Sequence, residues 1–502
     1  MTTVPSHVDV LIVGAGPTGT GLALELARTG VSVLLIDREA EIYPLPRAAH
    51  IDHETMRIFQ AQGIADAIET TCRIAPRYDF LTATGEILMR FDNADRLAEG
   101  GWHFANMIHQ PSIEALMREA LSKYPNARLS SCTEFVGQDL APDGVTATLR
   151  RDGKSFEVKA AYLVGADGAR SPVREMSGIG FEDLRFDEPW LVVDAIVHDS
   201  SRLPTCNLQI CDPKRPTTCV LMGQGRHRWE FMLMEDETPE QAMAEGFAEA
   251  LLAPWNVDGA VTVERKAVYR FHAKIASKWR KGRILLAGDA AHQMPPFAGQ
   301  GLCSGLRDAV NLGWKLAAVI HGAKEDLLDT YQLERAPHVR TIIELAVMMG
   351  QAVCVTDPAA AAERDAAMLA DRAAGKELGT ISYPGFSAGC RPTNGVACTG
   401  AGNYFPQAVS GSDGRWQRLD DHLGGTAWLL TRGERPVAGP SAPITPVAVE
   451  NIANPRLAPF RRQLEEWFDA HGCDAVLVRP DRYVFGGGDA EALLKAWAEV
   501  HR

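Results

Sequence analysis

The sequence predicts an α/β fold whose main domain is a parallel sheet with helices packed against it. Residues 8–13 are an apolar run of strand length that ends in a glycine-rich turn, and a helical pattern with one apolar face follows. Residues 31–36 are a second such run, and both are apolar enough to be buried on two faces. A helix between two buried strands is typical of a βαβ unit, which builds a parallel sheet.

A different pattern begins near residue 186 and predicts a second domain. Between residues 186 and 281, short β-rich runs alternate with turn signals, which is typical of an antiparallel sheet. The pattern of a buried strand returns at residues 283–287, and a long helical stretch follows. We therefore expect a discontinuous main domain of residues 1–185 and 282–375. The antiparallel domain, residues 186–281, would be inserted into it and bind the substrate.

The composition is that of a packed globular chain and argues against several partners. Of the 502 residues, 46% are hydrophobic and 23% are charged. Lys and Arg number 51 against 64 Asp and Glu, and the resulting net charge of −13 would repel nucleic acid. No run approaches the ~18 apolar residues of a membrane helix, so we expect no membrane partner. The 10 cysteines contain no CxxC pair, which favours reduced thiols in a cytoplasmic protein and no metal site.

The turn after the first strand carries the pattern Gly14-x-Gly16-x-x-Gly19, and Asp37 ends the next strand. Glycines let the backbone approach a pyrophosphate, and the helix N-terminus offers free N–H groups and the positive end of its dipole. An acid at the end of the second strand can accept hydrogen bonds from a ribose. The alternative is a glycine turn that closes an ordinary βα unit. Because strand, turn, helix and acid occur in order, the sequence favours a Rossmann-type dinucleotide site.

Two later segments place an aspartate directly after a buried strand. Asp167 lies in the segment 165–171, and Asp289 lies in the segment 288–292. Each aspartate by itself could simply cap a helix. The second segment continues through a proline pair to a Gly-Gln-Gly turn at residues 299–301, which precedes the long helical stretch. Two such segments behind a nucleotide fingerprint argue against a chance coincidence, and the choice between NAD and FAD rests on them.

In this order the three motifs resemble those of the single-component FAD-dependent aromatic hydroxylases, the class A flavoprotein monooxygenases. Runs at residues 211–216, 229–232 and 301–308 are similar to one branch of the family, the 3-(3-hydroxyphenyl)propionate hydroxylases. The resemblance covers residues 1 to about 350 and implies a Rossmann-type FAD-binding domain. One departure is Cys303, where these relatives usually carry Asn.

The resemblance also implies which side chains hold the cofactor. Asp289 would bind a ribityl hydroxyl, and the helix after the Gly-Gln-Gly turn would point its positive end at the pyrimidine edge of the flavin. Arg47 would lie beside the pyrophosphate, and Gln110 would bind the ribityl chain. The full set of expected FAD-binding residues is Gly14, Gly16, Gly19, Asp37, Arg38, Arg47, Gln110, Asp167, Asp289, Pro296, Gly299, Gln300, Gly301, Leu302 and Cys303.

Two residues are candidates for catalytic contact with the substrate. His50 follows residues 46–48, which we call the arginine segment, and a histidine titrates near neutral pH. His50 could therefore accept the proton of a phenol. The alternative is a packed or solvated histidine. Arg215, at a turn in the antiparallel domain, could pair with a substrate carboxylate, and it could equally be a solvated turn residue.

Beyond about residue 380, Pro and Gly become frequent, which predicts a linker and a third unit at residues 385–502. The run at residues 475–484 resembles the last strands of the thioredoxin-like domain that many of these hydroxylases carry. Only Cys473 lies near this run in the sequence, so we expect a structural unit without a redox dithiol.

The expected function is hydroxylation of a phenolic or related aromatic ring. By resemblance, NADH or NADPH reduces the FAD as a transient co-substrate, and O2 adds to it as a C4a-hydroperoxide that hydroxylates the ring. One alternative is epoxidation or Baeyer–Villiger oxidation of a polyketide or heteroaromatic. Another is a non-catalytic flavin-binding module, against which a substrate-sized inserted domain argues. A homodimer is compatible with these features.

Overall fold

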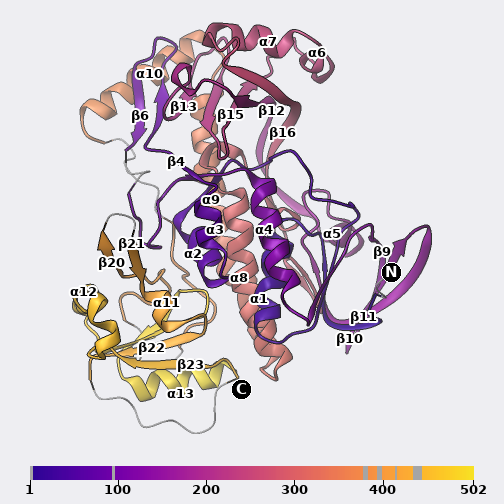
Figure 1. The fold of residues 1–502 in the computed structure, drawn as a ribbon, viewed down its shortest axis with the longest axis vertical. Coiled ribbons are helices and arrows are strands. Elements are labelled where there is room, and N and C mark those ends of the chain that lie inside the picture. The colour runs from indigo at the N-terminus through magenta and orange to yellow at the C-terminus, as the bar shows by residue number, and fades with distance from the viewer. Residues whose placement is uncertain are drawn as a thin grey trace.

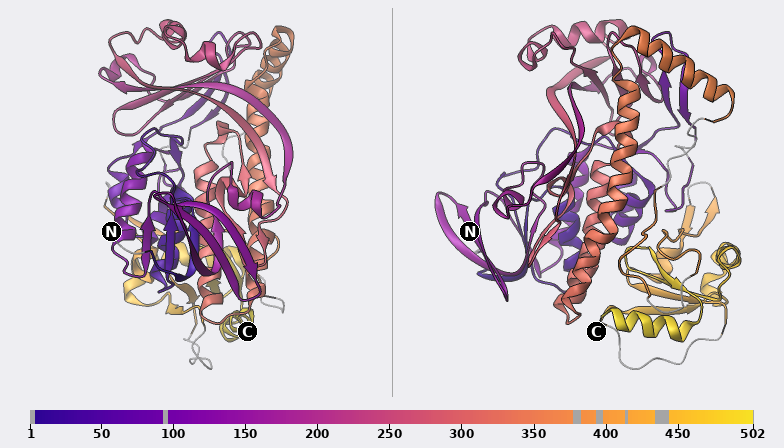
Figure 2. Two further views of the ribbon diagram at one scale, coloured as in Figure 1. Left: turned by 90° about the vertical axis from the view of Figure 1, so that its right-hand side faces the viewer. Right: turned by 180° about the vertical axis from the view of Figure 1, so that it is seen from behind.

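The structure, a computed structural model, describes residues 4–92, 96–376, 383–392, 398–412, 415–433 and 444–501. It has a mixed α/β fold with a largely parallel sheet, a largely antiparallel sheet and a small C-terminal sheet (Figure 1). Helices α8 (Gly301–Ile320) and α9 (Asp329–Val353) run through the middle of the molecule, and the antiparallel sheet lies across one end (Figures 1 and 2).

The first sheet has the parallel core that the sequence predicts. β1 (His7–Val13) pairs in parallel with β2 (Val33–Ile36) on one side and with β11 (Lys154–Gly165) on the other. β18 (Ile284–Leu286) adds in parallel to β11, so the chain returns to this sheet after a long excursion. The sheet is completed by β8 (Ala127–Ser130), β9 (Glu134–Ala141), β10 (Gly144–Arg151) and β17 (Arg280–Lys281).

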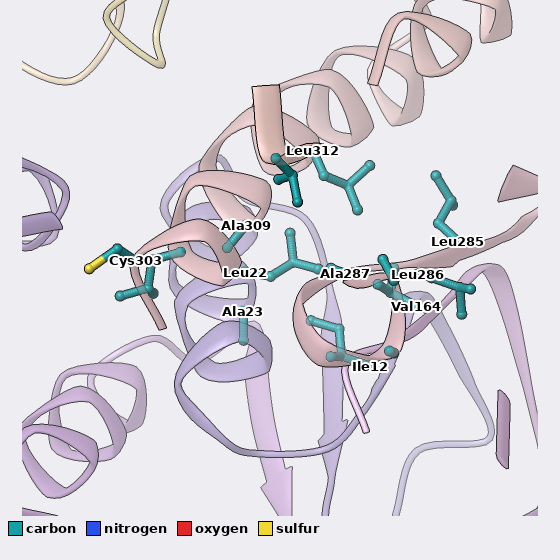
Figure 3. Packing of buried hydrophobic residues seen from close by; sticks show 14 of the residues in the cluster. Ile12, Leu22, Ala23, Val164, Leu285, Leu286, Ala287, Cys303, Ala309 and Leu312 are labelled. Atoms are coloured by element: carbon teal, nitrogen blue, oxygen red, sulfur yellow. The ribbon is translucent and has the colours of Figure 1, made fainter. Parts of the chain in front are cut away.

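Helix α1 (Pro17–Arg28) packs between this sheet and α8, where small residues allow a close approach. Figure 3 shows Leu22 and Ala23 of α1 beside Ala309 of α8 in the hydrophobic core. A Cβ atom on Gly21 would lie only 2.6 Å from Leu306 Cδ2. Glycine at this position therefore brings the start of α8 close to the start of α1.

The second sheet is centred on three long antiparallel strands, β12 (Phe181–Val197), β15 (Arg226–Met232) and β16 (Val261–Ala276). One of its faces packs against α6 (Pro239–Met243) and α7 (Phe247–Leu252). The sheet is completed by β19 (His292–Gln293), β14 (Thr217–Leu221), β13 (Asn207–Ile210), β5 (Tyr78–Leu81) and β6 (Ile87–Phe91). It therefore includes β5, β6 and β19 in addition to strands within residues 186–281.

Several short elements connect the two sheets. They are β3 (His50–Ile51), α2 (His53–Ala61), α3 (Ala65–Glu69), β4 (Arg73–Ile74), β7 (Asn106–Met107), α4 (Gln110–Ser122) and α5 (Pro172–Met176). Helix α10 (Pro358–Ala373) follows α9. Among the described helices, no single one has the length and apolarity to cross a membrane, and only the pair Glu325–Val353 and Pro358–Ala373, bent by 119°, meets both conditions together.

The C-terminal unit is built on a sheet with the strand order β23-β22-β24-β25. A buried ion pair and a buried hydrogen bond join it to the rest of the molecule. Arg479 Nη2 lies 2.8 Å from Glu334 Oε2 of α9, and Asp481 accepts a hydrogen bond from Asn311 of α8 at 2.9 Å. Its elements are β20 (Val409–Ser412), β21 (Arg415–Arg418), α11 (Leu419–Leu423), β22 (Ala427–Thr431), β23 (Val447–Asn451), α12 (Arg461–His471), β24 (Ala475–Val478), β25 (Val484–Gly487) and α13 (Ala490–Val500).

The expectation that Cys473 lies apart from every other thiol is wrong. A Cβ atom on Gly487 would lie 2.7 Å from Cys398 Sγ and 3.0 Å from Cys473 Sγ, so the two thiols are neighbours. Both cysteines are free. The two residues are far apart in the sequence, and only the folding of the C-terminal unit brings them together.

Candidate cofactor and active site

The glycine turn between β1 and α1 is tightly packed on one side and open on the other. Gly14 has a φ of 101°, and a Cβ atom there would lie 2.4 Å from the Ala166 carbonyl oxygen. A Cβ atom on Gly19 would lie 1.9 Å from the Gly14 carbonyl oxygen, so α1 approaches β1 this closely only with glycine. A Cβ atom on Gly16 would meet no described heavy atom within 4 Å beyond its chain neighbours. The free N–H groups at the start of α1 are thus accessible, and the turn fits a pyrophosphate.

Asp37 follows β2 and lies beside this turn. Its Oδ2 accepts a hydrogen bond from the Ala15 N–H at 2.8 Å, and its Oδ1 accepts one from the Glu39 N–H at 2.9 Å. The carboxylate is only partly buried, so lone pairs remain for a ribose hydroxyl. Arg38 is exposed, and its Nε lies 3.2 Å from Glu39 Oε1.

Asp167 lies against the same turn from the other side. A Cβ atom on Gly14 would lie 2.8 Å from Asp167 Cα. Asp167 Oδ2 accepts a hydrogen bond from the Val173 N–H at 3.1 Å, whereas Oδ1 is buried and has no hydrogen-bond partner among the described residues. Burial raises the pKa of this carboxyl. A buried polar atom without a partner is costly, so Oδ1 is suited to a hydrogen bond from a ligand.

Asp289 is placed beside the N-terminal ends of both α1 and α8. A Cβ atom on Gly288 would lie 2.7 Å from Thr18 Oγ1, and one on Gly305 would lie 2.2 Å from the same oxygen. These glycines bring the acidic segment, α1 and α8 together around Thr18. Asp289 is exposed although Gly288 and Ala290 on either side are buried, so its carboxylate is accessible to a bound molecule.

Helix α8 begins at Gly301, directly after the predicted Gly-Gln-Gly turn. Pro296 opens the short 3-10 turn Pro296–Ala298, and Gly299 follows with a left-handed φ of 63°. The first N–H groups of a helix have no partner within the helix, so those of Gly301, Leu302 and Cys303 can donate hydrogen bonds to an electron-rich ring edge. This geometry fits the role that the resemblance gives to the turn.

His50 and Cys303 meet the turn from the side of the core. His50 Nδ1 lies 3.2 Å from the Gly299 carbonyl oxygen, and burial lowers the pKa of its imidazole. The Cys303 side chain is fully buried in the hydrophobic core, as Figure 3 shows, and burial raises its pKa to about 12. Its thiol therefore stays protonated, and any contact of Cys303 with a cofactor would come from its backbone.

Gln110 supports the arginine segment rather than standing free. Its Oε1 accepts hydrogen bonds from the Ala48 N–H at 2.7 Å and the Arg47 N–H at 3.2 Å, and its Nε2 donates to Glu114 Oε1 at 2.7 Å. The Arg47 side chain is exposed, with its guanidinium 5.0 Å from the centre of the Tyr43 ring. Gln110 therefore fixes the backbone from which Arg47 extends.

Sequence reasoning missed a buried clamp between the antiparallel sheet and this arginine segment. Arg228 of β15 donates to the carbonyls of Pro46 at 2.6 Å and Arg47 at 2.8 Å, and Arg265 of β16 donates to the same Pro46 carbonyl at 2.6 Å. Both guanidinium groups pair with Asp194 of β12, at 2.6 Å and 3.2 Å. No local pattern in the mixed sequences of β15 and β16 marks these two arginines as buried.

Sequence reasoning also missed Arg307, which stands behind the turn. Its Nε lies 2.5 Å from Glu54 Oε2, its Nη1 donates to Gln300 Oε1 at 3.0 Å, and it also pairs with Asp52. Its guanidinium lies 4.4 Å from the centre of the Tyr383 ring. Arg307 thus joins α2, the turn before α8 and the segment that leads to the C-terminal unit.

Arg215, a candidate partner for a substrate carboxylate, is paired with another residue of the protein. Its guanidinium makes a bidentate ion pair with Glu237, at 2.5 Å and 2.6 Å, and donates to the Met232 carbonyl at 2.8 Å. It is therefore neither a solvated turn residue nor a free cation. Glu237 neutralises its charge, so a substrate carboxylate would have to compete with Glu237 for Arg215.

Comparison with known proteins agrees with this geometry. The sequence matches the family model of an FAD binding domain over residues 7–346 and that of the HcaD C-terminal domain over residues 448–502. It is 37% identical to the probable NADH-specific resorcinol 4-hydroxylase of Rhodococcus jostii (strain RHA1) over 497 residues, which cover 95% of this chain and 92% of that protein. The chain belongs to the FAD-dependent aromatic hydroxylases.

Other members of this family and solved structures extend the comparison. The hydroxylase is 33% identical to the 3-(3-hydroxy-phenyl)propionate/3-hydroxycinnamic acid hydroxylase of Burkholderia cenocepacia (strain HI2424), with 97% of this chain and 95% of that protein covered. The flavin-dependent monooxygenase PieE, solved with FAD and substrate, is 25% identical with a TM-score of 0.81, covering 99% of this chain and 98% of PieE. The p-nitrophenol 4-monooxygenase PnpA of Pseudomonas putida DLL-E4 is 26% identical with a TM-score of 0.66, covering 73% and 94%.

These findings confirm the predicted class of enzyme. The hydroxylase is an FAD-dependent monooxygenase that acts on a phenolic ring with NAD(P)H as the reductant. Its fold is the mixed α/β fold of such enzymes, with the Rossmann-like parallel sheet at the expected glycine motif. Within the described ranges, no group of three or more His, Cys, Asp or Glu residues could hold a metal ion.

Proposed function

We propose that the hydroxylase acts on a small phenol without a carboxylate group, with NADH as the reductant and resorcinol as the model substrate. The relative from Rhodococcus is named for resorcinol and NADH, and the relative from Burkholderia is named for substrates with a carboxylate. The two classes of substrate differ in charge. The charges that surround the substrate therefore offer a way to choose between them.

The observation that carries the proposal is that two arginines of the antiparallel sheet and a third in one of its loops are already paired. Arg228 and Arg265 share Asp194 and hold backbone carbonyls, and Arg215 is paired with Glu237. A carboxylate taken into a buried site needs a cation or several hydrogen-bond donors to offset its desolvation. A neutral phenol makes no such demand, and its hydroxyl groups require only hydrogen-bond partners.

The cofactor would be held by the residues that the sequence analysis selected. The open turn at Gly16, the Asp37 carboxylate and the exposed Asp289 fit the diphosphate, the ribose and the ribityl chain. The N-terminus of α8 fits the pyrimidine edge. Bound FAD would supply the redox chemistry, in which it takes electrons from NADH and delivers one oxygen atom of O2 to the ring. The protein orients the ring and keeps water out.

The test is NADH oxidation by the purified holoenzyme with resorcinol, phenol and 3-(3-hydroxyphenyl)propionate, with product masses. We expect resorcinol to stimulate oxidation and to gain one oxygen atom, and the carboxylated compound to be turned over at least roughly tenfold less efficiently, a difference of about 1.4 kcal/mol in activation free energy. Preferred turnover of the carboxylated compound would overturn the proposal.

Other expectations stay predictions. They are the division into domains at residues 1–185 with 282–375, 186–281 and 385–502, the thioredoxin-like character of the third, assembly as a homodimer, and a cytoplasmic location. Size-exclusion chromatography with light scattering tests the dimer.

A further inference from the structure

Glu230 of β15 lies on the face of the antiparallel sheet that is turned toward the segments expected to bind the flavin. Successive side chains of a strand point to opposite faces. Trp229 and Phe231 belong to the hydrophobic cluster beneath α6 and α7, on the far face. Arg228 reaches the Pro46 carbonyl, and Met232 belongs to the core cluster of the FAD-binding part. Glu230 stands between Arg228 and Met232 and shares their face.

The carboxyl of Glu230 is buried and poorly paired. The residue is only 6% exposed, and the nearest cation, Arg228 Nη1, lies 3.6 Å from its Oε1, beyond a normal hydrogen bond. That guanidinium is used instead by Asp194, whose Oδ1 lies 2.6 Å from Arg228 Nε. A carboxyl that is buried without a close partner is costly and marks a candidate for function.

The neighbours of Glu230 form a polar strip suited to ring hydroxyl groups. Across the sheet, Glu230 pairs with Val192 of β12 and with Thr218 of β14. Thr218 Oγ1 donates to Gln209 Oε1 at 2.8 Å, and Tyr78 OH donates to the same oxygen at 3.0 Å. The strip therefore offers hydroxyl and amide groups next to one ionisable carboxyl, and none of these groups except Glu230 carries a charge at neutral pH.

The charged groups around Glu230 set its protonation. Burial raises its pKa, Arg228 on its own strand lowers it, Asp194 on β12 raises it and Arg265 on β16 lowers it, and the balance is a raised pKa. Tyr78 on β5 faces it as well, and burial together with Glu230 raises the pKa of that phenol. A carboxylate with a raised pKa is a stronger base, closer to the acidity of a phenol.

We propose that Glu230 is a catalytic residue that accepts the proton of the substrate's ring hydroxyl during hydroxylation. The inference rests on the proposed function. The ring O–H bond breaks, the proton moves to a Glu230 carboxylate oxygen, and the electron pair stays on the ring oxygen, from which it enriches the ortho and para carbons. Once a ring carbon has received its new hydroxyl group, that carbon releases its hydrogen as a proton to water. The ring oxygen then takes its proton back from Glu230, which restores the carboxylate.

Glu230 replaces His50 as the leading candidate for this role. His50 lies at the turn before α8, with its Nδ1 engaged at the Gly299 carbonyl 3.2 Å away. Its lowered pKa makes its imidazole a weaker base than usual. Glu230 instead belongs to the sheet that would cover the substrate, and its carboxyl has no short contact that must be broken first.

The experiment compares Glu230→Gln with Glu237→Gln, a control in the loop after β15 that makes the same change at a carboxyl paired with Arg215. In the holoenzyme we expect Glu230→Gln to retain FAD and its anaerobic reduction by NADH, and to lose roughly 100-fold or more in kcat for hydroxylation. The acidic limb of the pH profile of kcat/KM should lie above the ordinary range of a glutamate in the wild type and in Glu237→Gln. It should disappear in Glu230→Gln.

Further variants keep the inference falsifiable. Glu230→Asp should keep an acidic limb and part of the activity, and His50→Gln should keep the limb where wild type has it. If Glu230→Gln fails to bind FAD, Glu230→Asp and His50→Gln test the inference: the first should lose part of the activity, and the second should leave the acidic limb in place. A wild-type rate and an unchanged acidic limb in Glu230→Gln, or loss of the limb in His50→Gln, would overturn the inference. Absence of phenol-stimulated NADH oxidation in the wild type would instead refute the proposed function itself.

Discussion

Arg228 of β15 and Asp194 of β12 face each other across the antiparallel sheet, with Arg228 Nε 2.6 Å from Asp194 Oδ1. Both side chains are almost fully buried. Through the same guanidinium, the sheet holds the carbonyls of Pro46 and Arg47, from whose segment the expected pyrophosphate arginine extends. One ion pair thus fixes the sheet that would carry the substrate to the segment that would carry the flavin.

Asp194→Asn should therefore lower stability strongly, because it removes the carboxylate that the buried Arg228 and Arg265 share. Loss of one partner of a buried pair costs about 3–5 kcal/mol. Thermal unfolding of the holoenzyme checks this prediction. The control is Glu264→Gln, whose pair with Arg226 is partly exposed and should be worth less than about 1 kcal/mol. Equal shifts in the two variants would show that the clamp is not important for stability.

Asp37→Ala should weaken FAD binding without unfolding the protein. The substitution removes the acceptor for the expected ribose hydroxyl, together with the hydrogen bond from the Ala15 N–H. A hydrogen bond to a charged group contributes about 1.5–3 kcal/mol, so the dissociation constant of FAD should rise roughly 10- to 100-fold. Flavin fluorescence during titration of the apoprotein measures it. Glu39→Gln, at the exposed neighbour, should bind FAD like the wild type, and unaltered affinity in Asp37→Ala would contradict the assignment.

Acid should release the C-terminal unit from α9. Burial alone would raise the pKa of Glu334, but Arg479 and Lys315 outweigh it and hold that pKa at about 2. Because the folded pKa lies below the unfolded value of about 4.3, this contribution to stability is complete above pH ~5 and is lost as the pH falls toward 2. The urea concentration at the midpoint of unfolding should thus decrease as the pH is lowered through this window. In Glu334→Gln the urea midpoint should be lower than in the wild type at pH 7 and should depend less on pH. An equal pH dependence of the midpoint in the two proteins would contradict the prediction.

Cys473→Ser should leave turnover unchanged, although Cys398 lies next to Cys473. Burial raises the pKa of the Cys473 thiol to about 12, so the reactive thiolate is scarce at neutral pH. The kcat and FAD content of Cys473→Ser and Cys398→Ser check this. A large loss of kcat in a folded, FAD-loaded variant would assign the thiol pair a role in turnover.

The sequence predicted well what depends on neighbouring residues. The glycine turn, the strand on either side of α1 and the helix that begins at Gly301 all follow from short runs of apolar and glycine residues. The antiparallel sheet expected from residue 186 onward was found, but its strand β12 begins already at Phe181. The first half of β12 is mostly polar and pairs with β16 only, so the hydrophobic signal is weak there.

What depends on contacts between distant segments was missed. β5 pairs in parallel with β13, so residues 78–81 and their neighbour β6 join a sheet whose remaining strands come from a distant part of the sequence. Arg215 was expected at a substrate because no local pattern reveals its partner Glu237. The same holds for Cys398 beside Cys473. Glu230 was visible as a charge in an apolar strand, but its importance depends on which face it shares with Arg228.

The most direct test of the central claim is hydroxylation of resorcinol by the FAD-loaded enzyme under 18O2 with NADH. The account predicts a product heavier by one 18O atom, with one NADH consumed for each product formed, and no product without FAD. Consumption of NADH with release of hydrogen peroxide and no labelled product, for resorcinol and for other phenols, would contradict it.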